Sequence, residues 1–264
     1  MKTPVILAAF GTASARTAST YRFIEEGIRS SLADTPLSLA FSARTGKGAQ
    51  ESLPDRSLSP LECLAAFAAQ GISQAVIQPL QLLPGHEFHM LQRECRQSPI
   101  PYHIGRPLLT TPQDYRDLAE SLAPMIEGMP DQAILLIGHG TGHPIWIAYY
   151  AIERYLRQRF GERLFVGVIE KNPDSSMLPG EIIAAGWKRV CLIPLLLTTG
   201  MHFERDINGL GPLSWRSQLE SLGLSVGSVD QGLGHLPGVI ALLTAHIREV
   251  LAEAGDATSS THQY

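Results

Sequence analysis

Three polar residues in the second half of the sequence each follow an apolar segment. They are His139, Glu170 and His202. Two imidazoles and a carboxylate are suitable ligands for a divalent transition metal, and three ligands leave coordination positions open. Imidazoles also have an ordinary pKa of about 6.5, so they can accept protons near neutral pH. The residue types therefore predict metal and proton chemistry at one site.

Each of these residues also has a purely structural interpretation. His139, between two glycines, would suit a loop anchor, Glu170 a surface ion pair, and His202 a solvated loop. The two halves of the sequence can be aligned with each other, and in this alignment Phe10 stands opposite His139 and Glu87 opposite His202. We therefore expect only the second half to bind the metal.

Internal similarity shows that the chain contains two copies of one unit. Residues 6–12 match 135–141 and residues 79–88 match 194–203, while Leu108 and Pro112 correspond more weakly to Leu233 and Pro237. Matches in the same order indicate a duplication rather than a short solenoid repeat. We predict an N-terminal α/β lobe over 1–128 and a C-terminal α/β lobe over 129–264 that carries the metal site, with 255–264 as a disordered tail.

Both copies alternate short apolar runs with amphipathic segments, which is typical of parallel strands joined by crossover helices. The fold class predicted is α/β, with two similar Rossmann-like lobes, each a mainly parallel sheet flanked by helices. In such sheets ligands bind beyond the carboxyl ends of the strands. The strands predicted are 4–9, 37–41, 75–80, 133–137, 164–169, 190–197 and 225–229, and the helices 20–32, 61–70, 145–160, 178–185 and 239–253.

Composition excludes several classes of protein. The chain has 264 residues, 44% hydrophobic and 17% charged, with a net charge of −4, so we expect neither a nucleic-acid partner nor a membrane partner. Its apolar runs are shorter than the ~20 residues that span a bilayer. Three separated cysteines without a CxxC motif indicate a reducing cytoplasm. Dinucleotide, Walker and nucleophile-elbow motifs are absent, so no organic cofactor is predicted.

Four segments together, 9–12, 138–141, 166–170 and 194–202, resemble the class II chelatases, and among them the anaerobic sirohydrochlorin cobaltochelatases of the CbiK type. The resemblance covers nearly the whole chain. It implies a bilobal fold with a tetrapyrrole in the active-site cleft between the lobes. His139 resembles the family's metal-binding, proton-accepting histidine, and Glu170 and His202 resemble its other metal ligands. Catalytic roles are thus implied for His139 and Glu170.

The resemblance has three departures. Met201 replaces an aspartate that usually precedes the second histidine, residues 210–214 replace an acidic stretch, and 44–60 lacks a basic helix pattern. Acidic groups raise the local cation concentration, so the first two departures concern metal delivery and preference.

The function implied is insertion of Co²⁺, as substrate, into sirohydrochlorin for anaerobic cobalamin biosynthesis in the cytoplasm. Fe²⁺ or Ni²⁺ is equally suited to these ligands. A sirohydrochlorin ferrochelatase for sirohaem, another ferrochelatase, and a non-catalytic tetrapyrrole or metal carrier stay open as alternatives. A homo-oligomer is also compatible with the sequence.

Contacts to the substrate are predicted at the strand-to-helix turn of the first copy. The substrate-binding candidates there are Phe10, Gly11 and Thr12, together with Arg44. Lys47, Arg16 and Arg106 are further candidates for binding the substrate carboxylates. His86 and His89 lie three residues apart, and either a haem or metal site or an exposed helix start is consistent with them.

Overall fold

The computed structural model describes residues 2–10, 15–42 and 58–260. The chain divides into two compact units, one of residues 1–110 with 240–264 and one of residues 111–239. This division differs from the predicted boundary at 128, because helix α4 (Pro112–Glu127) belongs to the second unit and most of helix α8 (Pro237–Ser260) belongs to the first.

Side-chain contacts explain this division. In α4, Tyr115 stacks on Tyr155 of helix α5 (Ala148–Phe160) with ring centroids 5.3 Å apart. In α8, Ile240 lies against Gly27 of helix α1 (Ala15–Ser31), and Arg248 donates to the Ser31 carbonyl. The C-terminal helix thus completes the unit that begins the chain.

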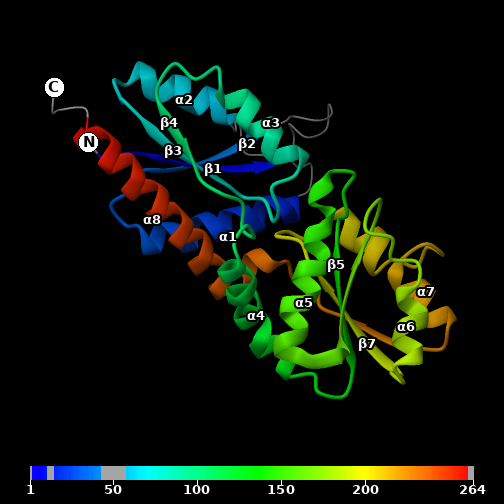
Figure 1. The fold of residues 1–264 in the computed structure, drawn as a ribbon. Helices are drawn as coiled ribbons and strands as arrows, with labels where there is room; N and C mark the ends of the chain where they lie inside the picture. Colours follow the sequence, from blue (N-terminus) through cyan, green and yellow to red (C-terminus); the bar gives the residue numbers. More distant parts are fainter. Residues whose placement is uncertain (1, 11–14, 43–57, 261–264) are drawn as a thin grey trace. The chain divides into compact units, whose positions relative to one another are not determined.

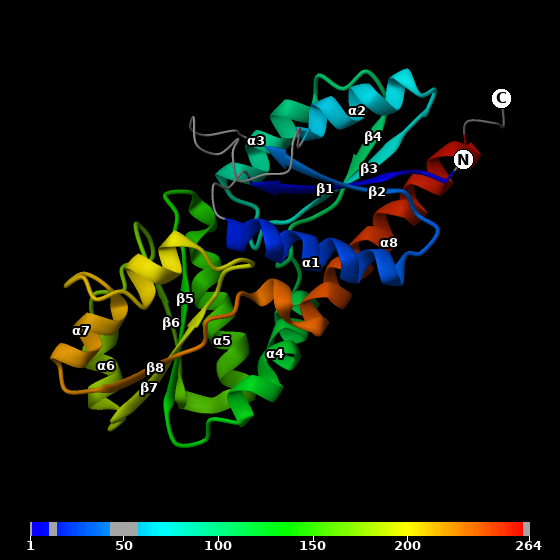
Figure 2. The same ribbon diagram turned by 180° about the vertical axis from the view of Figure 1, so that it is seen from behind.

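The first unit contains a parallel sheet with strand order β2-β1-β3-β4. Figures 1 and 2 show α2 and α3 on one face of this sheet and α1 with α8 on the other. Buried side chains of α2 and α3, among them Leu64 and Leu91, pack against Ile6 and Ile77 of the sheet. The elements are β1 (Val5–Phe10), β2 (Leu37–Ser42), α2 (Pro60–Ala69), β3 (Ala75–Pro79), α3 (His86–Cys95) and β4 (Tyr102–Ile104).

The second unit contains a parallel sheet with the equivalent order, β6-β5-β7-β8. Helices α4 and α5 lie on one side of it and α6 and α7 on the other (Figure 1). Its core joins Leu135 and Leu192 to Ile182 of α6 and Trp215 of α7. The elements are β5 (Ala133–Gly138), β6 (Leu164–Val168), α6 (Leu178–Ala184), β7 (Arg189–Pro194), α7 (Trp215–Ser221) and β8 (Ser225–Ser228). Two equivalent sheets confirm the predicted fold class.

Several predicted elements have different bounds. The helix expected over 145–160 begins as a 3₁₀ turn, η1 (Pro144–Ile147), before α5. The strand expected over 190–197 ends at Pro194. The apolar run continues beyond it because Leu195 and Leu197 are also buried in the core. Helix α8 extends to Ser260, into the segment 255–264 that was expected to be disordered. The short strand β4 and the helices α3, α4 and α7 were not among the predicted elements.

All three cysteines are free and buried. Burial raises the pKa of the Cys63 thiol to about 11 and that of Cys95 to about 12, and it also raises the pKa of Cys191. No helix in the described part of the chain is long and apolar enough to span a bilayer.

Candidate metal centre

Three neighbouring strands of the second unit position the predicted ligands. His139 follows β5, Glu170 lies just beyond β6, and His202 follows the loop after β7. These strands are adjacent in the order β6-β5-β7, so their carboxyl ends share one edge of the sheet. The rings of His139 and His202 are 4.7 Å apart between centroids and nearly perpendicular. Nδ1 of His139 is 3.6 Å from Oε1 of Glu170. The three side chains therefore lie together.

The site is accessible to solvent. The side chains of His139, Glu170 and His202 are 43%, 45% and 42% exposed. In the described part of the chain, no group of three or more His, Cys, Asp and Glu side chains is arranged to hold a metal ion. The three residues are thus neighbours without being a closed ligand cage.

Backbone hydrogen bonds continue between the loops after β5 and β6. The Ile169 amide donates to the Gly138 carbonyl at 2.9 Å, and the Glu170 amide donates to the His139 carbonyl at 3.1 Å. One step further, the Thr141 amide donates to the Asn172 carbonyl at 3.1 Å. The main chain that carries Glu170 is therefore tied directly to the main chain that carries His139.

Glycine is required at two positions around His139. Gly140 has φ of +83°, and a Cβ there would overlap the Glu170 carbonyl oxygen. A Cβ at Gly138 would overlap the ring of Tyr149. The Tyr149 hydroxyl accepts a hydrogen bond from the Gly140 amide at 3.1 Å, which anchors the loop to α5. The two glycines thus allow the close approach of β5, β6 and α5.

Glu170 also pairs with the residue that follows it. Nζ of Lys171 is 3.1 Å from Oε1 of Glu170. The hydrogen bond from Lys171 lowers the pKa of Glu170 most, burial opposes it, and the charge of His139 adds to the lowering. Lys171 itself has φ of +62°, an unusual conformation for a residue with a side chain. Glu170 is therefore ionised, with an ammonium group beside it.

His202 begins a turn that sequence patterns did not predict. The segment η3 (Phe203–Ile207) is a π-helical turn in which the Asn208 amide donates to the Phe203 carbonyl at 2.8 Å. Asp206 lies one turn after His202, and its Oδ2 is 2.8 Å from Nδ1 of the imidazole. Arg205 binds the same carboxylate and lowers the pKa of Asp206 more than His202 does. In a helical turn, residues four apart lie on the same face, so the spacing of His202 and Asp206 could have predicted this contact.

The remaining site predictions have mixed outcomes. Phe10 ends β1 and is half-buried, whereas Gly11, Thr12, Arg44 and Lys47 lie outside the described residues. Arg16 is half-buried in α1. Arg106 forms an ion pair with Glu249 at 2.8 Å.

Three further histidines are outside this group. The His143 ring accepts a hydrogen bond from the Ile145 amide and so caps η1. His86 and His89 are exposed on α3, and Nδ1 of His89 is 3.2 Å from Oε1 of Gln92. His143 therefore lies at a helix start, and the interpretation of His86 and His89 as exposed residues of a helix start fits their positions on α3.

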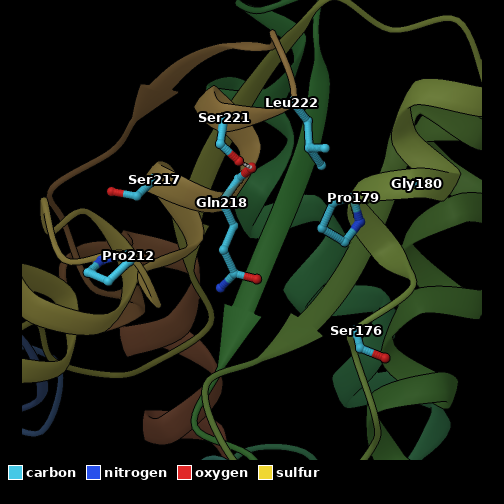
Figure 3. A pocket seen from close by; sticks show the side chains of 8 residues that line it. All are labelled: Ser176, Pro179, Gly180, Pro212, Ser217, Gln218, Ser221 and Leu222. Carbon is cyan, nitrogen blue, oxygen red and sulfur yellow. Dashed lines mark hydrogen bonds between the residues drawn. The ribbon is translucent and has the colours of Figure 1, made fainter.

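One surface hollow in the second unit is separate from the three candidate ligands. It has a volume of about 590 Å³ and lies between Pro179 and Gly180 of α6 and Ser217 and Gln218 of α7 (Figure 3). A hollow of about 330 Å³ lies beside the candidate site instead, lined by Met201, Arg205 and Leu210 among others. We take the ligand cluster, rather than the larger hollow, as the functional site because it contains the chemically active groups.

Comparison with solved structures defines the class of fold. A sirohydrochlorin chelatase, SirB from Bacillus subtilis subspecies spizizenii in complex with cobalt, superposes with a TM-score of 0.67 at 15% identity over 96% of both chains. SirB from Bacillus subtilis with Fe³⁺ gives 0.68 at 16% identity, covering 97% of this chain and 98% of that one. The fold is therefore the two-lobe α/β fold of the chelatases.

The family follows from the sequence itself. Residues 3–252 match the family model of the cobalt chelatases (CbiK), so this chain belongs to that family. A sirohydrochlorin cobaltochelatase of Nitratidesulfovibrio vulgaris is 28% identical over 97% of this chain and 93% of its own length. The sirohydrochlorin cobaltochelatase of Salmonella typhimurium is 29% identical over 73% of this chain and 74% of its own. The chain is thus a metal chelatase, and a divalent metal ion is one of its substrates.

Proposed function

We propose that this chain inserts Co²⁺ into sirohydrochlorin. The observation that carries the proposal is the convergence of His139, Glu170 and His202, from three separate strands, on one sheet edge. Family membership and the names of the two relatives support the choice of metal and macrocycle.

The reaction exchanges protons for a metal ion. Two pyrrole N–H protons leave the macrocycle as one Co²⁺ enters, so the charge at its centre is conserved. Nδ1 of His139 lies 3.2 Å from the Gly140 carbonyl oxygen, which can only accept a hydrogen bond. The proton is then on Nδ1, and the lone pair on Nε2 is available for the metal or for a pyrrole proton.

Glu170 and His202 would supply the other two ligands. The carboxylate of Glu170 offsets the charge of the cation and can relay protons released near His139, at 3.6 Å. All three side chains are more than two-fifths exposed, so the cation can enter and leave. A metal ion that is a substrate needs ligands that are exposed, because the ion must leave the protein and enter the macrocycle.

Visible spectroscopy of purified protein with sirohydrochlorin and Co²⁺ tests the proposal under anaerobic conditions. We expect many turnovers per chain, no reaction with protoporphyrin, and slower insertion with Fe²⁺ or Ni²⁺. A spectral change that stops at one macrocycle per chain supports a carrier instead. Faster insertion of Fe²⁺ supports a ferrochelatase.

Replacing either imidazole tests the site. His139→Ala and His202→Ala should each slow insertion by about 100-fold or more, as expected for loss of a base or ligand, without changing the melting temperature. His89→Ala is the matched control, because His89 is an exposed histidine of the other unit. Unchanged rates in both site variants would contradict the assignment.

A further inference from the structure

Asp206 makes a short, oriented contact with one nitrogen of His202. Its Oδ2 lies 2.8 Å from Nδ1 of the imidazole, and its side chain is 21% exposed against 42% for His202. A carboxylate only accepts hydrogen bonds, so Nδ1 of His202 is the donor. The other ring nitrogen, Nε2, is left with the lone pair that a metal needs.

Arg205 fixes the orientation of that carboxylate. Its Nε is 2.9 Å from Oδ1 of Asp206, and its second terminal nitrogen is 3.2 Å from Oδ2. The guanidinium therefore contacts both oxygens of one carboxylate, a geometry that is specific as well as favourable. Arg205 itself is 73% exposed, so its role is toward Asp206 rather than the core.

The two imidazoles of the site are held in unequal ways. His139 donates from Nδ1 to the carbonyl of its own neighbour, Gly140, at 3.2 Å. His202 donates to a charged side chain at a shorter distance. Hydrogen bonds to ionised acceptors are about twice as strong as those between neutral groups. The ring of His202 is therefore the more firmly oriented of the two.

We propose that Asp206 is a positioning residue that orients His202 and selects its Nε2 as the metal donor. This inference rests on the proposed function, which makes His202 a ligand. Asp206 acts on the metal through the imidazole, because its carboxylate is already engaged by Arg205 and His202. Partners of this kind change metal affinity by about 10–100-fold.

Cobalt binding by the protein alone tests this role. Asp206→Ala should weaken the Kd for Co²⁺, followed by visible absorption, by about 10–100-fold. Asp206→Asn keeps an oxygen that can accept from Nδ1, so it should recover part of the loss. Glu204→Ala is the matched control, since it removes one negative charge from the same turn at an exposed position. We expect it to change the Kd by less than about twofold.

Two further measurements separate positioning from general electrostatics. In the His202→Ala background, adding Asp206→Ala should change the Kd by less than about twofold, because the residue acts through the imidazole. Long-range ¹H–¹⁵N NMR of the metal-free protein at pH 8 should show the proton of His202 on Nδ1, and a mixture of tautomers in Asp206→Ala.

The results of these binding and NMR measurements decide whether Asp206 has the positioning role. An unchanged Kd in Asp206→Ala, losses that multiply in the double variant, or a proton on Nε2 in the parent protein overturns the positioning role. An unchanged Kd in His202→Ala instead overturns the ligand assignment of the proposed function. If Asp206→Ala does not fold, Asp206→Asn with the NMR measurement provides the same decision.

Discussion

At the scale of single residues, one of the three candidate metal donors, the carboxylate of Glu170, is already paired with a cationic side chain. Nζ of Lys171 occupies one side of the Glu170 carboxylate, at 3.1 Å, and must give way when that carboxylate binds a cation. Exposed ion pairs of this kind contribute about 1 kcal/mol or less. The competition is therefore weak enough for a metal ion to overcome.

Lys171→Gln should tighten Co²⁺ binding by up to about fivefold, because the side chain stays polar and loses the competing charge. Isothermal titration calorimetry at pH 7.5 measures the change. Lys188→Gln removes the same charge from an exposed position of the same unit and should leave the affinity unaltered. An equal gain in both variants would show a general charge effect and no local competition.

Sequence patterns located the three donors but not their partners. His139, Glu170 and His202 were found because each follows an apolar run, and this property depends only on local sequence. Asp206 was not found, because its contact with His202 depends on a helical turn that the pattern read as a loop. Lys171 was weighed as a surface partner of Glu170, but its left-handed backbone was not indicated.

At the scale of elements, the candidate metal centre depends on two loops that share backbone hydrogen bonds. The loops after β5 and β6 approach so closely that only glycine fits at position 140. This arrangement couples the placement of Glu170 to the conformation of the His139 loop. A change in the glycine should therefore affect both donors together.

Gly140→Ala should lower the free energy of unfolding by about 2 kcal/mol or more, through backbone strain and overlap with the Glu170 carbonyl. It should also weaken Co²⁺ binding. Gly142→Ala is the matched control, since a Cβ there meets nothing within 4 Å. Urea denaturation and cobalt titration of both variants provide the comparison, and equal stability of the two would contradict the steric argument.

In the described part of the chain, apolar periodicity predicted every strand except β4, and it predicted helices α1, α2, α5, α6 and α8 but not α3, α4 or α7. Two of the differences in bounds have local causes. Leu195 and Leu197 extend the apolar run past the end of β7 because they are buried in the core. The turn η1 has 3₁₀ geometry beginning at Pro144, which hydrophobic spacing does not distinguish from an α-helix.

At the scale of the whole molecule, two sheets of equivalent order show that the duplication read from sequence is also structural. The two imidazoles of the candidate site have no histidine counterparts in the other copy, since Phe10 and Glu87 stand where His139 and His202 do. The assignment of α8 to the first unit was not predictable, because it follows from tertiary contacts such as Ile240 against Gly27. Local sequence does not report which unit a terminal helix joins.

The native protein should not react with a thiol reagent such as dithionitrobenzoate at pH 8. A pKa of about 11 leaves roughly 0.1% thiolate at that pH, and burial blocks access as well. Because the raised pKa retains the proton, reactivity should stay low until strongly alkaline pH. In guanidinium chloride all three thiols should react, and a rapid reaction of any one in the folded protein would contradict the burial of the cysteines.

The burial of the three cysteine thiols has a consequence for an enzyme whose substrate is a transition-metal ion. Thiolates are strong ligands for transition-metal ions. A cysteine on the surface would therefore compete with the macrocycle for each metal ion. Because Cys63, Cys95 and Cys191 are all buried, these thiols do not compete with the two imidazoles and the carboxylate of the candidate site for the ion. The molecule can thus pass its ion onward rather than sequester it.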